Sequence, residues 1–459
     1  MFIVKSFLTI VLLLIFLNPV STQDLTGKWM GLLKIQGMEL DLYFNISQKN
    51  NEYVATLDVP KQGAKGIPVT AIALKDATLN ISVGALGMTY SGIIKNDSLV
   101  KGEFKQMATL LPLDLKRVTA EATVLARPQT PKAPFPYREE NITFRNSKDQ
   151  ISLAGTLTLP KNVADFPTVI LISGSGPQDR NSEIFGHQPF WVIADYLTRQ
   201  GIGVLRFDDR GTGDSEGDFS TATSFDFVKD VRAAVAFLKN RRDVNNGKIG
   251  LIGHSEGGLI APLVANGPDA IGFIVLLAGP GLPGKELMLL QKSTIEKASN
   301  LPVPMIERGQ VIFEGAYDRI QQAAPADLTL KDSLIVYFRT SYNNLMPEDQ
   351  LHRLAGQLSS PWMIHFIKHD PAAVLQKVTV PVLALNGEKD LQVPAKENLV
   401  AIEAALKKGG NTLFVTKQFP DLNHLFQTCE TGLVSEYGLL EETFSETVLA
   451  EITEWIKLQ

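Results

Sequence analysis

Ser255 lies in the pentapeptide Gly253-His254-Ser255-Glu256-Gly257, directly after the apolar run Lys248–Ile252. A serine hydroxyl attacks a carbonyl carbon only when a base takes its proton and donors hold the resulting oxyanion. Gly253 and Gly257 carry no side chains, so a strand and a helix can approach closely while the serine takes strained backbone angles. The segment therefore predicts a nucleophile elbow with Ser255 at its tip.

A nucleophile of this kind needs an acid and a histidine later in the chain, in that order. The predicted strand Pro381–Leu385 leads into a turn that contains Glu388 and Asp390. Glu388 comes while the chain is still leaving the strand, whereas Asp390 lies further out, where a side chain can turn back to a histidine. Asp390 is the predicted acid, with Glu388 as the alternative.

His424 is the only one of the six histidines that follows the last predicted strand and precedes the final helix. It is the predicted general base toward Ser255 and then the general acid toward the leaving group, and a surface loop histidine is the alternative interpretation. His254 is expected to pack, because neighbouring side chains on a sharp elbow point apart. His365 and His369 are four residues apart, but no third ligand is evident, so neither a metal nor a cofactor is predicted.

Two backbone N–H groups are expected to form the oxyanion hole. One belongs to Glu256, the residue after the nucleophile. The other is expected from the glycine-containing loop 173–180 after the strand Thr168–Ile172, with Ser175 as the first choice and Gly176 as the second. A phosphate-binding loop is the alternative, but the glycine and lysine pattern that it requires is missing.

The turn Phe207–Gly217, which contains an Asp-x-Arg-Gly-x-Gly-x-Ser-like motif, together with the elbow resembles the α/β-hydrolase family over residues 137–459. More narrowly, residues 173–180, 277–281 and 386–394 resemble bacterial serine carboxylesterases that carry an extra N-terminal β domain. The resemblance implies Ser255, Asp390 and His424 as the catalytic triad. Ser173 stands where the lipase and esterase branch with His-Gly at the oxyanion loop has its histidine.

Strand and helix patterns alternate from residue 137 to 459 and predict a doubly wound, mostly parallel sheet. One helix, over Ser224–Arg241, places Phe225, Val228, Val231, Val235 and Leu238 on one face. Residues 282–376 contain no convincing strand, so we expect a helical cap inserted above the carboxyl edge of the sheet.

The first part of the chain has a different pattern. About eight short β-type runs over residues 23–122 predict a small all-β, barrel-like domain. Residues 123–136 are a proline-rich linker. Residues 1–22 have the charged start, short apolar core and small-residue exit of a signal peptide, and a membrane anchor is the alternative. The single cysteine, Cys429, excludes an intrachain disulfide.

The predicted protein is secreted or periplasmic, in a bacterial envelope, with no stable membrane insertion after cleavage. A net charge of -5 without a long basic run argues against nucleic acid as a partner. The expected activity is cleavage of small carboxylic esters with short acyl chains through an acyl-enzyme. A serine peptidase or aminopeptidase is the alternative, which an amine-recognising carboxylate pair in the cap would favour, with Glu307, Glu314 and Asp318 as candidates. A non-catalytic binding protein on the same scaffold is the third interpretation.

Overall fold

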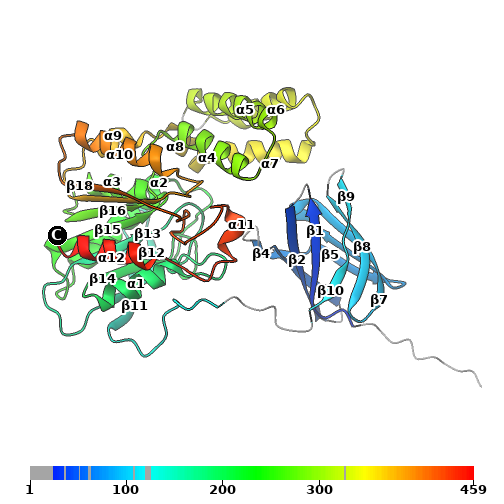
Figure 1. Cartoon of the computed structure of the whole chain (residues 1–459), viewed down its shortest axis with the longest axis horizontal. Coiled ribbons are helices and arrows are strands. Elements are labelled where there is room, and N and C mark those ends of the chain that lie inside the picture. The colour runs from blue at the N-terminus through cyan, green and yellow to red at the C-terminus, as the bar shows by residue number, and fades with distance from the viewer. Residues whose placement is uncertain are drawn as a thin grey trace, which may run out of the picture. The chain divides into compact units, whose positions relative to one another are not determined.

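The computed structural model describes residues 24–459 except 36–37, 51, 60–63, 107–108, 119–125 and 325–326. The described residues divide into two compact units, residues 24–118 and residues 126–459 (Figure 1). The predicted signal peptide and the first three residues of the predicted linker lie outside the described residues.

The first unit is a single antiparallel sheet that curls into a half-barrel (Figure 1), which confirms the predicted all-β, barrel-like class. Its order is β4-β3-β2-β1-β10-β8-β7-β6-β5, and β9 pairs with β8. Trp29, Phe44 and Tyr90 fill its core. The strands are β1 (Gly27–Ile35), β2 (Met38–Lys49), β3 (Glu52–Val59), β4 (Ala64–Pro68), β5 (Ala71–Lys75), β6 (Thr78–Val83), β7 (Met88–Asn96), β8 (Leu99–Gln106), β9 (Thr109–Pro112) and β10 (Leu115–Arg117).

The second unit is built on a sheet in the order β11-β12-β14-β13-β15-β16-β17-β18. β11, β12 and β14 pair antiparallel, and every pair from β14–β13 to β17–β18 is parallel, which confirms the predicted mostly parallel α/β-hydrolase sheet. The strands are β11 (Arg138–Asn146), β12 (Ile151–Leu159), β13 (Thr168–Ile172), β14 (Gly203–Phe207), β15 (Ile249–His254), β16 (Phe273–Leu277), β17 (Val382–Gly387) and β18 (Phe414–Phe419).

Helices cover both faces of this sheet. α1 (Pro189–Arg199) and α12 (Glu446–Ile456) contribute to one hydrophobic core, and α2 (Ser224–Lys239), α3 (Gly257–Ala265), α9 (Pro371–Leu375) and α10 (Ala395–Lys408) contribute to the other. Val228, Val231, Val235 and Leu238 of α2 are buried as predicted, but the prediction for Phe225 is wrong. Phe225 is 50% exposed, because its ring lies against His365 instead of under the sheet.

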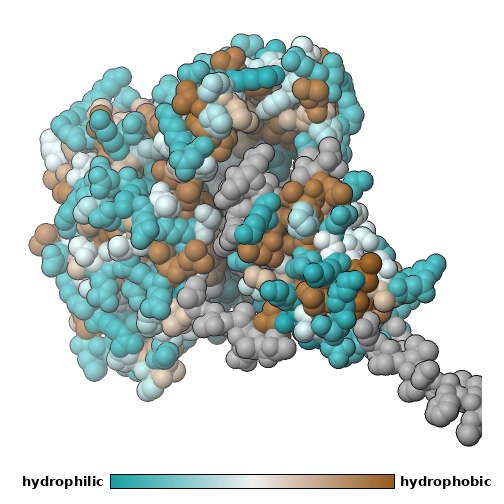
Figure 2. Space-filling model, turned by 45° about the vertical axis from the view of Figure 1, so that its right-hand side comes forward, coloured by the Kyte–Doolittle hydropathy of each residue, from teal (hydrophilic) through white to brown (hydrophobic). Residues whose placement is uncertain are grey.

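A layer of helices follows β16 and lies beside the carboxyl ends of the parallel strands (Figure 1). It contains α4 (Gly284–Ala298), α5 (Val303–Gln322), α6 (Leu330–Ser341), α7 (Glu348–Leu358) and α8 (Pro361–Lys368). These helices share their own core around Phe338 and Leu351. Hydrophobic and hydrophilic residues are interspersed over the outer surface of this helical layer (Figure 2). We call α4 to α8 the cap. A short helix, α11 (Val434–Tyr437), precedes α12.

Candidate active site

The turn between β15 and α3 holds Ser255 in a left-handed backbone conformation, with φ of 54°. A Cβ on Gly253 would lie 2.0 Å from the carbonyl oxygen of Gly257, and one on Gly257 would lie 2.3 Å from that of Ile172. Only glycine fits at both positions, so strand and helix can close on each other and turn Ser255 outward. The Ser255 N–H donates to the carbonyl of Leu277 at 2.9 Å, which ties the turn to β16.

His424 and Asp390 form a buried pair. The Nδ1–H of His424 donates to Asp390 Oδ2 at 2.7 Å, and the two residues are 4% and 2% exposed. Asp390 Oδ1 also accepts the backbone N–H groups of Gln392 and Val393, at 2.8 and 2.9 Å. These bonds fix the carboxylate and leave Nε2 of the imidazole for the serine. Glu388, the alternative acid, is exposed and has no such contact among the described residues.

The loop that carries His424 is held by hydrogen bonds on both sides of the residue. Asn423 Oδ1 accepts the N–H groups of Leu425 and Gln427, at 2.9 and 3.0 Å. His254 Nε2–H donates to the carbonyl oxygen of His424 at 2.9 Å. Burial, and then the nearby His424, lower the pKa of His254 to about 3, so His254 acts as a neutral donor. His254 therefore positions the His424 backbone, and it lines the same cavity as Ser255, so it does more than the packing expected from the sequence.

The loop after β13 lies directly against Ser255. A Cβ on Gly174 would be 3.0 Å from the Cβ of Ser255, so a side chain there would push the loop away. Ser175 and Gly176 follow, and both line the same cavity as Ser255. Their backbone N–H groups are therefore brought to the part of the site where the oxyanion hole was predicted.

Asp209, at the end of β14, anchors this loop, and sequence reasoning did not single it out. Its carboxyl group accepts the Ser173 hydroxyl at 2.5 Å and the Gln178 N–H at 2.9 Å. Burial raises the pKa of Asp209 to about 7, and the nearby carboxyl groups of Glu256 and Asp230 add to the shift. Asp209 could have been found from its position directly after a buried strand, because that strand ends at the same edge of the sheet as β13.

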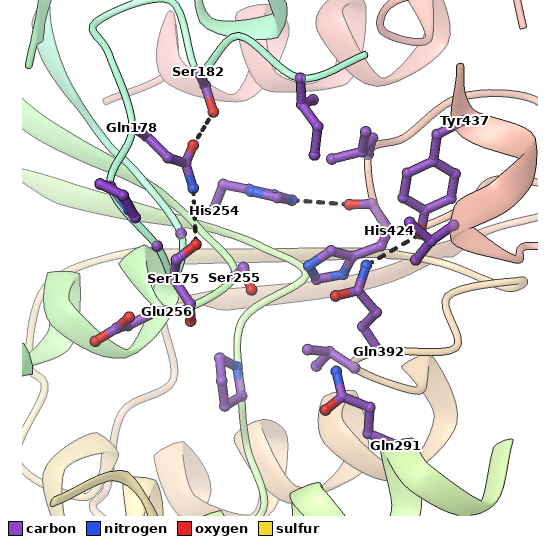
Figure 3. Close-up of a pocket in the computed structure, with 18 of the residues that line it drawn as sticks. Ser175, Gln178, Ser182, His254, Ser255, Glu256, Gln291, Gln392, His424 and Tyr437 are labelled. Carbon is purple, nitrogen blue, oxygen red and sulfur yellow. Dashed lines mark hydrogen bonds between the residues drawn. The ribbon is translucent and has the colours of Figure 1, made fainter. Parts of the chain in front are cut away.

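A cavity of about 570 Å³ opens onto Ser255 and His424, and Ser175 and Glu256 also line it (Figure 3). The Ser255 side chain lies beside the His424 ring, whereas the Glu256 carboxyl group points away from both (Figure 3). Asp390 lies behind His424, as an orienting acid must. The structure thus brings together every residue that the sequence assigned to this site.

The other groups considered from the sequence lie elsewhere. Asp318 pairs with Lys285 at 2.6 Å, Glu314 lies 3.8 Å from the same lysine, and Glu307 is exposed; none of these carboxylates lines the cavity. His365 and His369 have ring centroids 5.7 Å apart at the end of α8. No group of three potential metal ligands occurs among the described residues, and the absence of a metal stays a prediction.

Replacing Asp390 by asparagine should lower kcat for a hydrolysed ester by about 10⁴-fold, because the amide no longer holds the Nδ1–H tautomer of His424. The matched control is Glu388→Gln, which removes a neighbouring exposed carboxylate and should leave kcat unchanged. Initial rates of both purified variants test this. Equal losses in the two variants would exclude Asp390 as the specific acid.

Asp209→Asn should change how stability depends on pH. The pKa of about 7 in the folded protein lies above the ordinary 3.8, so the unfolded chain releases this proton first. The wild type should therefore lose stability relative to the variant as pH rises from about 4 to about 7, by at most about 1.4 kcal/mol per pH unit. Urea unfolding across this range measures the difference. A difference that does not vary with pH would contradict the assignment.

Several known proteins are similar to this chain. Esterase EstD of Thermotoga maritima is 25% identical over 328 residues, which cover 70% of this chain and 68% of that protein. The uncharacterized protein YfhR of Escherichia coli K12 is 27% identical over 188 residues, 38% of this chain and 62% of that one. The solved Pyrococcus furiosus esterase Pf2001 aligns with a TM-score of 0.44 and 18% identity, over 73% of this chain and 98% of that chain. The family model described as serine aminopeptidase, S33 (Hydrolase_4) matches residues 190–427, more than half of the sequence, and the chain belongs to this family of α/β-hydrolases.

Proposed function

We propose that this protein is a serine carboxylesterase that cleaves small esters with short acyl chains, using Ser255, His424 and Asp390. The observation that carries the proposal is the buried His424–Asp390 pair, whose imidazole lies beside the strained Ser255 in one cavity (Figure 3). The name of the relative EstD supports an ester substrate. The cavity volume of about 570 Å³ is suited to a small molecule.

Under this proposal, the Ser255 hydroxyl attacks the ester carbon while His424 Nε2 takes its proton. The carbonyl oxygen becomes an oxyanion that accepts the backbone N–H groups of Ser175 and Glu256, with Gly176 as an alternative donor. The bond to the alcohol then breaks, and His424 returns the proton to the departing oxygen. Water attacks the acyl-enzyme with His424 again as the base, which releases the acid and restores Ser255.

The same fold could also serve peptide cleavage, and the family description names an aminopeptidase. An aminopeptidase needs carboxylates that hold the substrate amine. The carboxylates that line the cavity are Glu183, which is exposed, and Glu256, whose carboxyl group points away from Ser255. This arrangement favours esters over aminoacyl amides.

Ser255→Ala should lower hydrolysis of p-nitrophenyl acetate by about 10⁴- to 10⁶-fold, because the nucleophile is lost while the backbone of the site is kept. Circular dichroism should show a folded variant. A fluorophosphonate probe should label the wild type but not the variant. The wild type should hydrolyse acetyl and butyryl esters faster than dodecanoyl esters and aminoacyl amides.

Retained activity in Ser255→Ala would exclude Ser255 as the nucleophile. Faster turnover of aminoacyl amides than of esters by the wild type would favour the peptidase. Failure of the probe to label folded wild-type protein would favour a non-catalytic binding protein.

We also propose that the protein is exported and cleaved near residue 22, to act in the envelope or outside a bacterial cell. The basis is the charged start and the short apolar run of residues 1–22. No helix among the described residues has the length and apolar character needed to span a bilayer. N-terminal sequencing of the protein recovered from an expressing bacterium should give a start near residue 23. An intact Met1 in a membrane fraction would contradict cleavage.

A further inference from the structure

One wall of the cavity is a continuous apolar surface supplied largely by the cap. Leu287 and Met288 of α4, Trp362 and Phe366 of α8, and Val393 belong to one hydrophobic cluster, and all five line the cavity. Trp362 and Phe366 stack with ring centroids 5.1 Å apart. This wall can receive an alkyl or aromatic group by burial of apolar area.

Polar side chains line the cavity on the side of His424, together with Leu425 and Val434. Gln291 of α4, Gln392 of the loop after β17 and Tyr437 of α11 lie on the His424 side of Ser255 (Figure 3). Gln392 Nε2 donates to the Tyr437 hydroxyl at 3.2 Å. Within the described chain, the side-chain amide of Gln291 and the side-chain oxygen of Gln392 make no hydrogen bond to protein groups. Each amide thus keeps groups available to a ligand.

The mechanism decides which part of an ester meets which wall; this step rests on the proposed function. His424 must give a proton to the departing oxygen, so the alcohol part lies beside His424. The carbonyl oxygen lies in the hole formed by the loop after β13. The acyl group is left with the remaining direction, toward the apolar wall. The glutamines and Tyr437 are therefore placed to contact the alcohol part.

The charge of the cavity restricts that alcohol further. The described residues that line the cavity include no lysine or arginine, so a phosphate or carboxylate would find no cationic side chain. Of its two carboxylates, Glu183 is exposed and Glu256 points away, so an amine has no buried partner. An amide side chain both donates and accepts, which matches a hydroxyl group. We propose that the substrate is an uncharged sugar carrying a short acyl ester, with the sugar held by Gln291 and Gln392.

The experiment compares two butyrate esters of similar size, 6-O-butyryl glucose and cyclohexylmethyl butyrate, with p-nitrophenyl butyrate as a general ester. The wild type should give a kcat/KM about tenfold or more higher for the glucose ester than for the cyclohexylmethyl ester, because only the former pairs the amide groups. Gln392→Leu and Gln291→Leu should each lower kcat/KM about tenfold more for the glucose ester than for the cyclohexylmethyl ester, mainly through KM.

Gln357→Leu is the matched control, since Gln357 is an exposed glutamine on α7 that does not line the cavity, and it should change neither rate. Equal rates on the two esters in the wild type, or equal losses on both in the two variants, would overturn the sugar assignment. Hydrolysis of p-nitrophenyl butyrate in the same experiment would still support the esterase proposal. No hydrolysis of any of the three esters would overturn the proposed function and the inference with it.

Discussion

The close contact of β15 with α3 is the constraint on which the site depends. Because Gly253 and Gly257 let backbone meet backbone, the chain reverses within two residues and Ser255 takes a φ of 54°. Such a conformation costs of the order of 1–3 kcal/mol in a residue other than glycine, and surrounding contacts must hold it. The Leu277 carbonyl, which accepts the Ser255 N–H, and the Ile172 carbonyl, which lies against Gly257, come from the neighbouring strands β16 and β13. Contacts with the neighbouring strands therefore hold Ser255 in its left-handed conformation.

The position of Ser255 determines where the other loops of the site must lie. The loops after β13, β14, β17 and β18 all leave the same edge of the sheet, because these four strands run parallel to one another. Asp209 then ties one of these loops to another through Ser173 and Gln178, and Asp390 ties a third to the loop of His424. The site therefore consists of loops that are joined by hydrogen bonds to carboxylates. The strand that precedes each loop determines where that loop lies.

This division explains what the sequence could predict. Ser255, Asp390 and His424 follow from strand order, because their places depend on the elements that precede them. Other contacts join segments that lie far apart in the chain: those of Asp209 with the loop after β13, of His254 with His424, and of Gln392 with Tyr437. A local sequence pattern cannot predict contacts of this kind. Strands β4, β9 and β10 are five, four and three residues long, too short for a clear alternation. Phe225 has the right spacing for the core, but periodicity alone cannot show that it lies against His365.

Glu256 connects the turn that carries Ser255 to the cap. Its backbone belongs to the elbow, while its Oε1 accepts the Ser224 hydroxyl at 2.6 Å and the indole N–H of Trp362 at 2.8 Å. Burial raises the pKa of this carboxyl group, which favours its neutral form, and the described residues that line the cavity include no lysine or arginine to pair with it. Trp362 also forms part of the apolar wall of the cavity. One side chain thus links the turn that carries Ser255 to α8 of the cap, so the position of Trp362 depends on the same residue that follows Ser255.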